Sequence, residues 1–241
     1  MEKQLSQVEK YYNKGLDALD AGNWLLAVQR FRKCIELDAK YAPAYHELAD
    51  IYYHNEQYDA ALSVLVDAIK LDPKDAESTF ALASVYLAQN KFLEALRVFK
   101  RLEQEAPEFS PELYYNLGVC YKSLGYPDYA MDYLKLAIEE DPSYFECLEV
   151  MGKLQFDAGK FDEAKKAFKE VLDADPGNIE AHHMLGVIYS KEMDLDAAIK
   201  EWETVNMLPD SDEALRTLAL TSISDAKALK KKNDKKESKE K

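Results

Sequence analysis

One alanine recurs along this chain at intervals of 34 or 35 residues, and one proline recurs with the same spacing. The alanines are Ala27, Ala61, Ala95, Ala130, Ala164 and Ala198. The prolines are Pro73, Pro107, Pro142 and Pro176, each 12 residues after its alanine. Alanine favours helices and proline ends them, so two residues with opposite roles share one period. This period predicts an array of repeated units rather than a single globular core.

The shared period divides the chain into six units. They are residues 8–41, 42–75, 76–109, 111–144, 145–178 and 179–212, with Ser110 as a one-residue insertion. Residues 1–7 extend the first predicted helix, and residues 213–230 predict a capping helix that offers Leu215, Leu218 and Ala219 to the last unit. Residues 231–241 are rich in Lys and contain no apolar side chain, which predicts a disordered tail.

Each unit has the apolar pattern of two helices. In the second unit, Tyr45, Leu48, Ala49 and Tyr52 fall on one helical face, and the second half of the unit repeats the pattern. Glycines such as Gly22, Gly125 and Gly159 separate the two halves and predict a turn. An Asp-Pro pair follows the second helix in several units, and proline cannot continue a helix. The chain is therefore predicted to be all-α, with short connections.

Small and large residues alternate at fixed positions of the unit. The eighth residue is always Gly or Ala, the twentieth is always Ala, and the twenty-fourth is always large and apolar. The large residues are Phe31, Leu65, Phe99, Leu134, Phe168 and Trp202. Small residues let two helices approach closely, and a bulky residue then fills the space between them. This pattern predicts a core that runs from unit to unit.

These residues resemble the tetratricopeptide repeat (TPR) family, whose pattern is Trp-Leu-Gly-Tyr-Ala-Phe-Ala-Pro at fixed places in 34 residues. The fourth unit carries Tyr114, Leu117, Gly118, Tyr121, Ala130, Leu134, Ala137 and Pro142 at those places. The resemblance covers residues 8–212 and weakens in the first unit, where Lys14, Ala18 and Ala39 replace the usual residues. It implies a right-handed superhelical solenoid of antiparallel helix pairs.

The resemblance also implies that the first helix of each unit lines a concave groove. The groove residues are then Tyr12, His46, Asp50, Tyr53, Phe80, Tyr115, Glu149, Phe156 and His183. Aromatic side chains on a concave surface indicate peptide binding, with Asp50 and Glu149 as charge selectors. In the alternative interpretation, some of these aromatic residues pack within or between the units.

Glutamate occupies the second position of five units: Glu9, Glu77, Glu112, Glu146 and Glu180. These residues are either an acidic ladder that selects basic ligands or a response to the helix dipole. In both cases the charges favour basic or neutral ligands.

A second candidate surface is formed by Trp24, Leu25 and Leu26, of which Leu25 and Leu26 occupy positions that are usually acidic in other units, as in Asp162 and Glu163. Three adjacent apolar residues there predict a self-association or partner site. Alternatively, residues 1–7 fold over them.

Composition and motifs exclude several classes of function. The formal net charge of −14 disfavours a body that binds nucleic acid, and no apolar run is long enough to span a membrane. Phosphate-binding loops, nucleophile elbows and metal-ligand spacings are missing from the sequence, so we expect no enzyme activity, no cofactor and no metal site. The three separated cysteines predict buried thiols, and the N-terminus lacks the apolar segment of a secretory signal. These features favour the cytoplasm.

The sequence thus predicts a non-catalytic scaffold or adaptor whose groove binds a basic or apolar peptide or protein. The residues of the TPR clamp for chaperone C-terminal carboxylates do not occur in any three consecutive units. Two alternatives remain open: a structural protein that forms homo-oligomers, or attachment to a membrane or polyanion through the Lys-rich tail.

Overall fold

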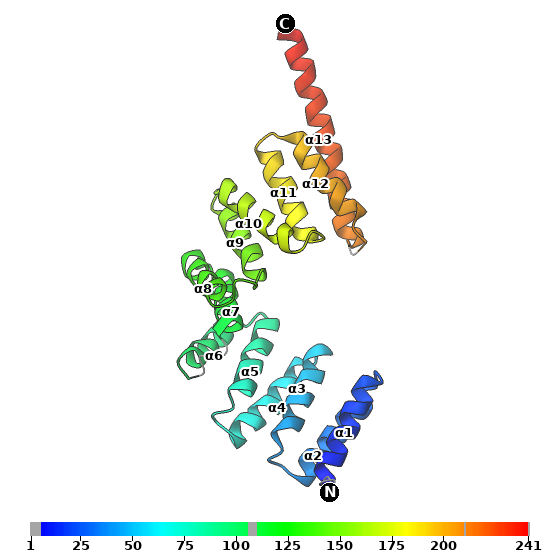
Figure 1. Cartoon of the computed structure of the whole chain (residues 1–241), viewed down its shortest axis with the longest axis vertical. Helices are drawn as coiled ribbons and strands as arrows, with labels where there is room; N and C mark the ends of the chain where they lie inside the picture. The colour runs from blue at the N-terminus through cyan, green and yellow to red at the C-terminus, as the bar shows by residue number, and fades with distance from the viewer. Residues whose placement is uncertain (1–5, 106–109, 210, 241) are drawn as a thin grey trace. The chain divides into compact units, whose positions relative to one another are not determined.

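The computed structural model describes residues 6–105, 110–209 and 211–240, without the side chains of Ser110 and residues 234–240. In this described part there are thirteen helices and no strand (Figure 1). The chain divides into two compact units, with the boundary between Tyr126 and Pro127. Below, the first unit is the part up to Tyr126, the second unit is the part from Pro127, and one 34-residue segment is called a repeat. The first contains α1 (Gln7–Asp20), α2 (Trp24–Leu37), α3 (Ala42–His54), α4 (Tyr58–Leu71), α5 (Ala76–Ala88), α6 (Phe92–Glu105) and α7 (Ser110–Ser123). The second contains α8 (Pro127–Glu140), α9 (Glu146–Asp157), α10 (Phe161–Ala174), α11 (Ile179–Lys191), α12 (Leu195–Met207) and α13 (Glu213–Glu240).

Within each unit, every helix packs against the next one along the chain. In the first unit, α1–α2, α3–α4 and α5–α6 are the helix pairs, and α3 also contacts α5 (Figure 1). In the second unit, α9–α10 and α11–α12 are the corresponding pairs, and α13 covers α12. The all-α fold of stacked helix pairs is therefore confirmed, and it places α3 and α5 side by side.

The predicted seam of small and large residues forms the core. All six recurring alanines are completely buried, and so are Phe31, Phe99 and Phe168. A methyl group added at Gly15 would lie 2.5 Å from Cε1 of Phe31, and one added at Gly152 would lie 2.9 Å from Cζ of Phe168. The glycines therefore provide the space that these phenylalanine rings occupy.

The helix ends combine the predicted glycine turns with an aspartate turn. Gly22, Gly125 and Gly159 have φ angles of 71°, 83° and 74°, where residues with a Cβ are disfavoured. The aspartates Asp38, Asp72, Asp141 and Asp175 lie directly after the second helices. The side chain of each accepts a hydrogen bond of 2.9 or 3.0 Å from the backbone N–H two residues later. This Asx-turn redirects the chain before the following helix begins.

The last helix is longer than the sequence predicted. α13 extends to Glu240, whereas residues 231–241 were expected to be disordered. Lys and Glu are good helix formers, and the helix that starts at Glu213 continues through them. Lys227 lies 3.3 Å from Glu203 of α12, and Lys230 pairs with Asp196. The face of α13 that is buried against α12 also differs from the expected one: Ala219, Ile223 and Ala226 are buried, whereas Leu218 is exposed.

Candidate functional site

The first unit contains a pocket between α3 and α5, with a volume of about 500 Å³. Its lining residues come mainly from the two first helices that the fold places side by side. They are His46, Glu47, Ala49, Asp50, Tyr53, Leu65, Glu77, Phe80, Ala81, Ser84 and Val85. Four residues predicted for the groove are among them, so the fold brings His46, Asp50, Tyr53 and Phe80 together.

The pocket has an apolar floor and an acidic rim. Ala49, Leu65 and Val85 are buried, whereas the side chains of Asp50 and Glu77 are 66% and 71% exposed. Glu47 contributes a third carboxylate, and none of the described lining residues is Lys or Arg. Carboxylates on a partly enclosed apolar surface create a negative potential that attracts cations.

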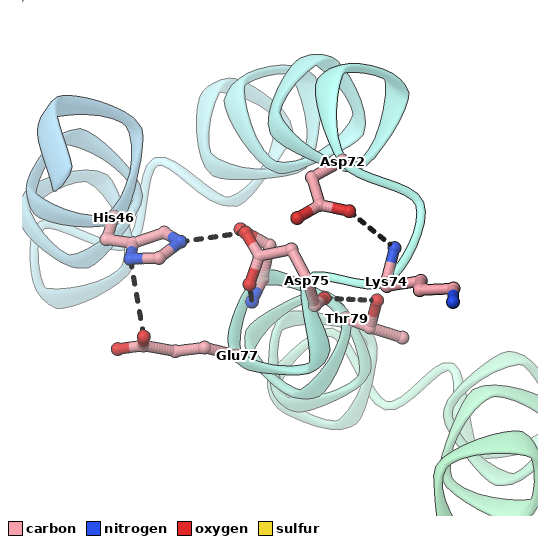
Figure 2. Close-up of polar contacts among 7 residues, drawn as sticks. His46, Asp72, Lys74, Asp75, Glu77 and Thr79 are labelled. Carbon is pink, nitrogen blue, oxygen red and sulfur yellow. Dashed lines mark hydrogen bonds and ion pairs between the residues drawn. The ribbon is translucent and has the colours of Figure 1, made fainter. Parts of the chain in front are cut away.

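His46 connects the two helices at this rim. Figure 2 shows its imidazole between two carboxylates, with Nε2 2.9 Å from Oδ2 of Asp75 and Nδ1 3.4 Å from Oε2 of Glu77. Carboxylates only accept hydrogen bonds, so the ring donates to both at once only when both nitrogens carry a proton. Through these contacts, His46 holds the start of α5 against α3.

Asp75 both caps α5 and orients His46. Its Oδ1 accepts a hydrogen bond of 3.0 Å from the N–H of Ser78, and its backbone carbonyl accepts one of 2.8 Å from Oγ1 of Thr79 (Figure 2). Burial raises the pKa of the Asp75 carboxyl, but the hydrogen bonds from Ser78 and His46 outweigh burial and lower the pKa below its ordinary value. The carboxylate form of Asp75 is therefore the form that fits this site.

Tyr12 lies behind the pocket rather than in it. Its ring packs against Phe31 and Tyr41, with centroid distances of 5.5 Å to each, and its hydroxyl donates a hydrogen bond of 2.8 Å to Oε1 of Glu47. Burial and the neighbouring carboxylate of Glu47 raise the pKa of Tyr12. Tyr12 thus positions a residue of the pocket wall.

The aromatic lining residues pack within the first unit and also line the pocket. Phe80 lines the pocket and also packs edge-to-face on Phe99, with 5.5 Å between centroids. Tyr53 lines the pocket and packs on Tyr58 at 5.9 Å. Packing within the unit therefore fixes these rings while part of each remains available at the pocket. Tyr115, on α7, is half-buried and is not part of the pocket lining.

The remaining predicted residues lie on α9 and α11 of the second unit. Glu149 accepts a hydrogen bond of 2.9 Å from Nζ of Lys153, which also lies 3.3 Å from Glu180. The ammonium of Lys191 lies 5.5 Å from the ring centroid of Phe156. Both Glu149 and Phe156 therefore already contact a lysine of the same chain.

His183 is half-buried on α11, and burial lowers its pKa. Its Nδ1 has no hydrogen-bond partner within the described part of the chain. The neutral imidazole is thus favoured at this position.

The proposed surface around Leu25 is smaller than expected. Leu25 is 58% exposed, but Trp24 and Leu26 are half-buried and pack against the core of the first unit. The three residues therefore do not form a continuous exposed apolar surface. Residues 1–7 were expected to extend the first helix or, in the alternative interpretation, to fold over this surface. Of these, residues 1–5 lie outside the described residues.

The acidic rim was only partly recognised in the sequence. Glu77 belonged to the series of glutamates at the second unit position, but its approach to His46 depends on how α3 and α5 pack. Glu47 follows the predicted His46 directly, and nothing in the sequence pattern distinguishes it from surface glutamates. The hydrogen bond from Tyr12, which lies in the preceding helix pair, is what fixes it at the pocket.

The sequence profile of the tetratricopeptide repeat matches residues 12–76, 46–108, 86–154 and 155–221. The chain belongs to the tetratricopeptide repeat family. Members of this family are generally protein-interaction scaffolds. The TPR repeat-containing protein YpiA of Bacillus subtilis is 26% identical over 193 residues, which are 79% of this chain and 45% of YpiA. The chain thus spans less than half the length of this relative.

Solved structures of TPR proteins have the same fold. The type IV pilus biogenesis factor PilW has a TM-score of 0.78 at 17% identity, over 89% of this chain and 99% of PilW. YrrB, described as a TPR protein with an unusual peptide-binding site, has a TM-score of 0.59 at 26% identity, over 80% of this chain and 96% of YrrB.

Two further properties concern the described residues alone. None of the helices in residues 6–105, 110–209 and 211–240 is long and apolar enough to cross a membrane. In the same ranges, His, Cys, Asp and Glu side chains do not gather into a group that could hold a metal ion. All three cysteines are free and buried, as the sequence predicted.

Proposed function

We propose that this TPR protein is a non-catalytic interaction scaffold, and that its first unit binds a segment of a partner protein in the pocket between α3 and α5. One observation carries the proposal: residues from two successive helix pairs enclose about 500 Å³ of space beside Tyr53 and Phe80. Pockets that bind small molecules have volumes of about 300–1,000 Å³ and combine apolar walls with a few polar groups, so this space is large enough for side chains of a bound segment.

Contacts within the first unit hold the lining residues of the pocket in place, which supports a preformed binding site. Tyr53 and Phe80 are fixed by Tyr58 and Phe99, and the rim is fixed by the hydrogen bonds of His46 and Glu47. A site that is formed before binding loses less side-chain entropy when a ligand arrives. YrrB, a TPR protein of known structure with 26% identity, is described as binding peptide.

Selection of peptides from a random displayed library on the immobilised full chain tests this function. The selected peptides are expected to bind the wild-type protein and to lose at least tenfold in affinity for a Tyr53→Ala, Phe80→Ala double variant. Rings at the centre of an interface commonly contribute this much. Tyr129→Ala is the matched control, because Tyr129 is a 58% exposed aromatic residue on α8 in the other unit.

Circular dichroism has to show the same helicity in all three proteins. Peptides that bind the double variant as tightly as the wild type would refute the pocket as the binding site.

A further inference from the structure

We infer that the occupant of this pocket is a basic side chain, of lysine or arginine, presented by an extended peptide. This inference rests on the proposed function and specifies its ligand. The evidence comes from a comparison between the two units of this chain. Helices α9 and α11 lie three repeats after α3 and α5, and their residues occupy the same positions of the 34-residue repeat.

In the second unit, a lysine bridges two neighbouring first helices. Nζ of Lys153 on α9 lies 3.3 Å from Oε1 of Glu180 on α11. The corresponding residues of the first unit are Asp50 on α3 and Glu77 on α5. The glutamate is the same, but the lysine on the preceding first helix is replaced by an aspartate. Nζ of Lys153 also donates a hydrogen bond to Oε1 of Glu149, whose place in the first unit is taken by His46. The first unit thus has two carboxylates and an imidazole where the second has a lysine between two glutamates.

A second lysine shows the same difference. Lys191, at the end of α11, places its ammonium 5.5 Å from the ring centroid of Phe156, within the range of a cation–π interaction. The corresponding residues of the first unit are Ala88 and Tyr53. The aromatic ring is conserved between the two units of the chain, and the cation is missing. Tyr53 lines the pocket at that place.

The two lysines that make these contacts in the second unit are therefore absent from the first, while one of the glutamates and the aromatic ring that bind them there are retained as Glu77 and Tyr53. Glu47 and Asp50 add two further carboxylates to the same pocket. His54 lies 3.2 Å from Asp50 and His46 lies 3.4 Å from Glu77, so the nearby basic groups are imidazoles rather than ammonium or guanidinium groups. A cation from outside the chain would complete the arrangement that the second unit contains internally.

The shape of the pocket suits a long basic side chain. Lysine and arginine have an apolar stem and a charged head, and they place the stem along apolar surface while the head stays near water. Ala49, Leu65 and Val85 supply the apolar surface, and the exposed carboxylates of Asp50 and Glu77 lie at the rim. A purely apolar side chain would fit the floor but would bring no ammonium or guanidinium group to the carboxylates at the rim.

The experiment uses the full chain labelled with ¹⁵N and the peptide acetyl-Gly-Ala-Lys-Ala-Gly-amide. Chemical-shift titration suits the weak binding, with a Kd of about 1 mM, that one side chain provides. The matched ligand carries N-acetyl-lysine, which has nearly the same shape but no charge and no ability to form a cation–π contact. The lysine peptide is expected to shift amides of α3 and α5, and the acetylated peptide is expected to bind at least tenfold more weakly.

The matched protein variant is Asp50→Lys, which gives the first unit the lysine of the second. This lysine is expected to pair with Glu77 as Lys153 pairs with Glu180, so the variant keeps its thermal stability but loses the lysine peptide by at least tenfold. Asp173→Lys, an exposed site on α10, makes the same charge change elsewhere and is expected to change affinity by less than twofold.

Equal binding of the lysine and acetyl-lysine peptides would overturn the inference, and so would unchanged affinity in Asp50→Lys. The inference and the proposed function can fail separately. If library peptides bind in a manner that depends on Tyr53 and Phe80 but not on basic residues or on Asp50, the pocket is a peptide site and the inference of a basic side chain as its occupant is wrong.

Discussion

Replacement of Gly15 by alanine separates two physical effects of opposite sign. Alanine is a better helix former than glycine by about 1 kcal/mol, so helix propensity alone predicts a more stable protein. The structure predicts the reverse, because the new methyl group would lie 2.5, 2.7 and 2.9 Å from three ring carbons of Phe31. Phe31 is completely buried, so its ring cannot move into solvent.

The expected magnitude follows from these two effects. Overpacking of a core by an extra methyl group costs about 1–3 kcal/mol, and three ring carbons within 2.9 Å place this site near the upper end. After the gain of about 1 kcal/mol from helix propensity, we expect a net loss of about 2 kcal/mol in the free energy of unfolding. Gly152→Ala, whose methyl group would lie 2.9 Å from Phe168, should lose less.

Urea unfolding followed by tryptophan fluorescence measures this loss. Trp24 packs against the core that contains Phe31, so a Trp202→Phe background makes the signal specific for the first unit. The control is the double variant Gly15→Ala, Phe31→Leu, which recreates the Ala49–Leu65 pair of the next repeat and should recover most of the stability. A Gly15→Ala protein as stable as the wild type, or more stable, would refute the steric explanation of the seam.

Two further perturbations test the cap of α5 and the buried thiols. Asp75→Ala should lower the free energy of unfolding by about 1 kcal/mol, as expected for loss of an N-cap, whereas Asp75→Asn keeps the cap and removes only the charge. Because the folded-state pKa of Asp75 is lowered, its charge stabilises the fold above the unfolded pKa of about 3.9, and this contribution is lost as the pH falls through the folded pKa. The stability difference between wild type and Asp75→Asn in urea unfolding should therefore shrink from pH 7 to pH 3, and a constant difference would exclude the ionised carboxylate as its source. Burial raises the pKa of Cys120 and Cys147 to about 12, so both should resist a thiol reagent such as DTNB at pH 8 in the native protein and react fully in urea; rapid labelling of the native protein would contradict their burial.

The fold was predictable because the period alone fixes which residues meet. Gly15 and Phe31 lie at the same unit positions as Gly152 and Phe168, and both pairs are in close contact in the structure. His46, Asp50, Tyr53 and Phe80 could be placed on one face because the family resemblance assigns the first helices to it. Which of these residues would enclose a pocket depended on the packing of α3 against α5.

Tyr12 and Glu149 make contacts that the repeat pattern does not specify. Tyr12 has the unit position of a groove residue, but its hydroxyl reaches Glu47 in the next repeat and its ring enters the core. Glu149 was expected to select ligand charge, and instead it binds Lys153 one helical turn away. A positional pattern cannot distinguish a free carboxylate from a paired one, because the partner is specified by the individual residue and not by the repeat.

The aspartate turn after α2, α4, α8 and α10 has a consequence for how such a chain can change length. Asp38 and Asp72 end α2 and α4 with the same hydrogen bond to the backbone, so each delivers the chain to the next helix in the same way. Removal of residues 42–75 would therefore join α2 to α5 through an equivalent bend. Gene duplication or deletion of whole repeats is compatible with this architecture, whereas an insertion of a few residues inside a repeat would move the next helix out of phase with its neighbour.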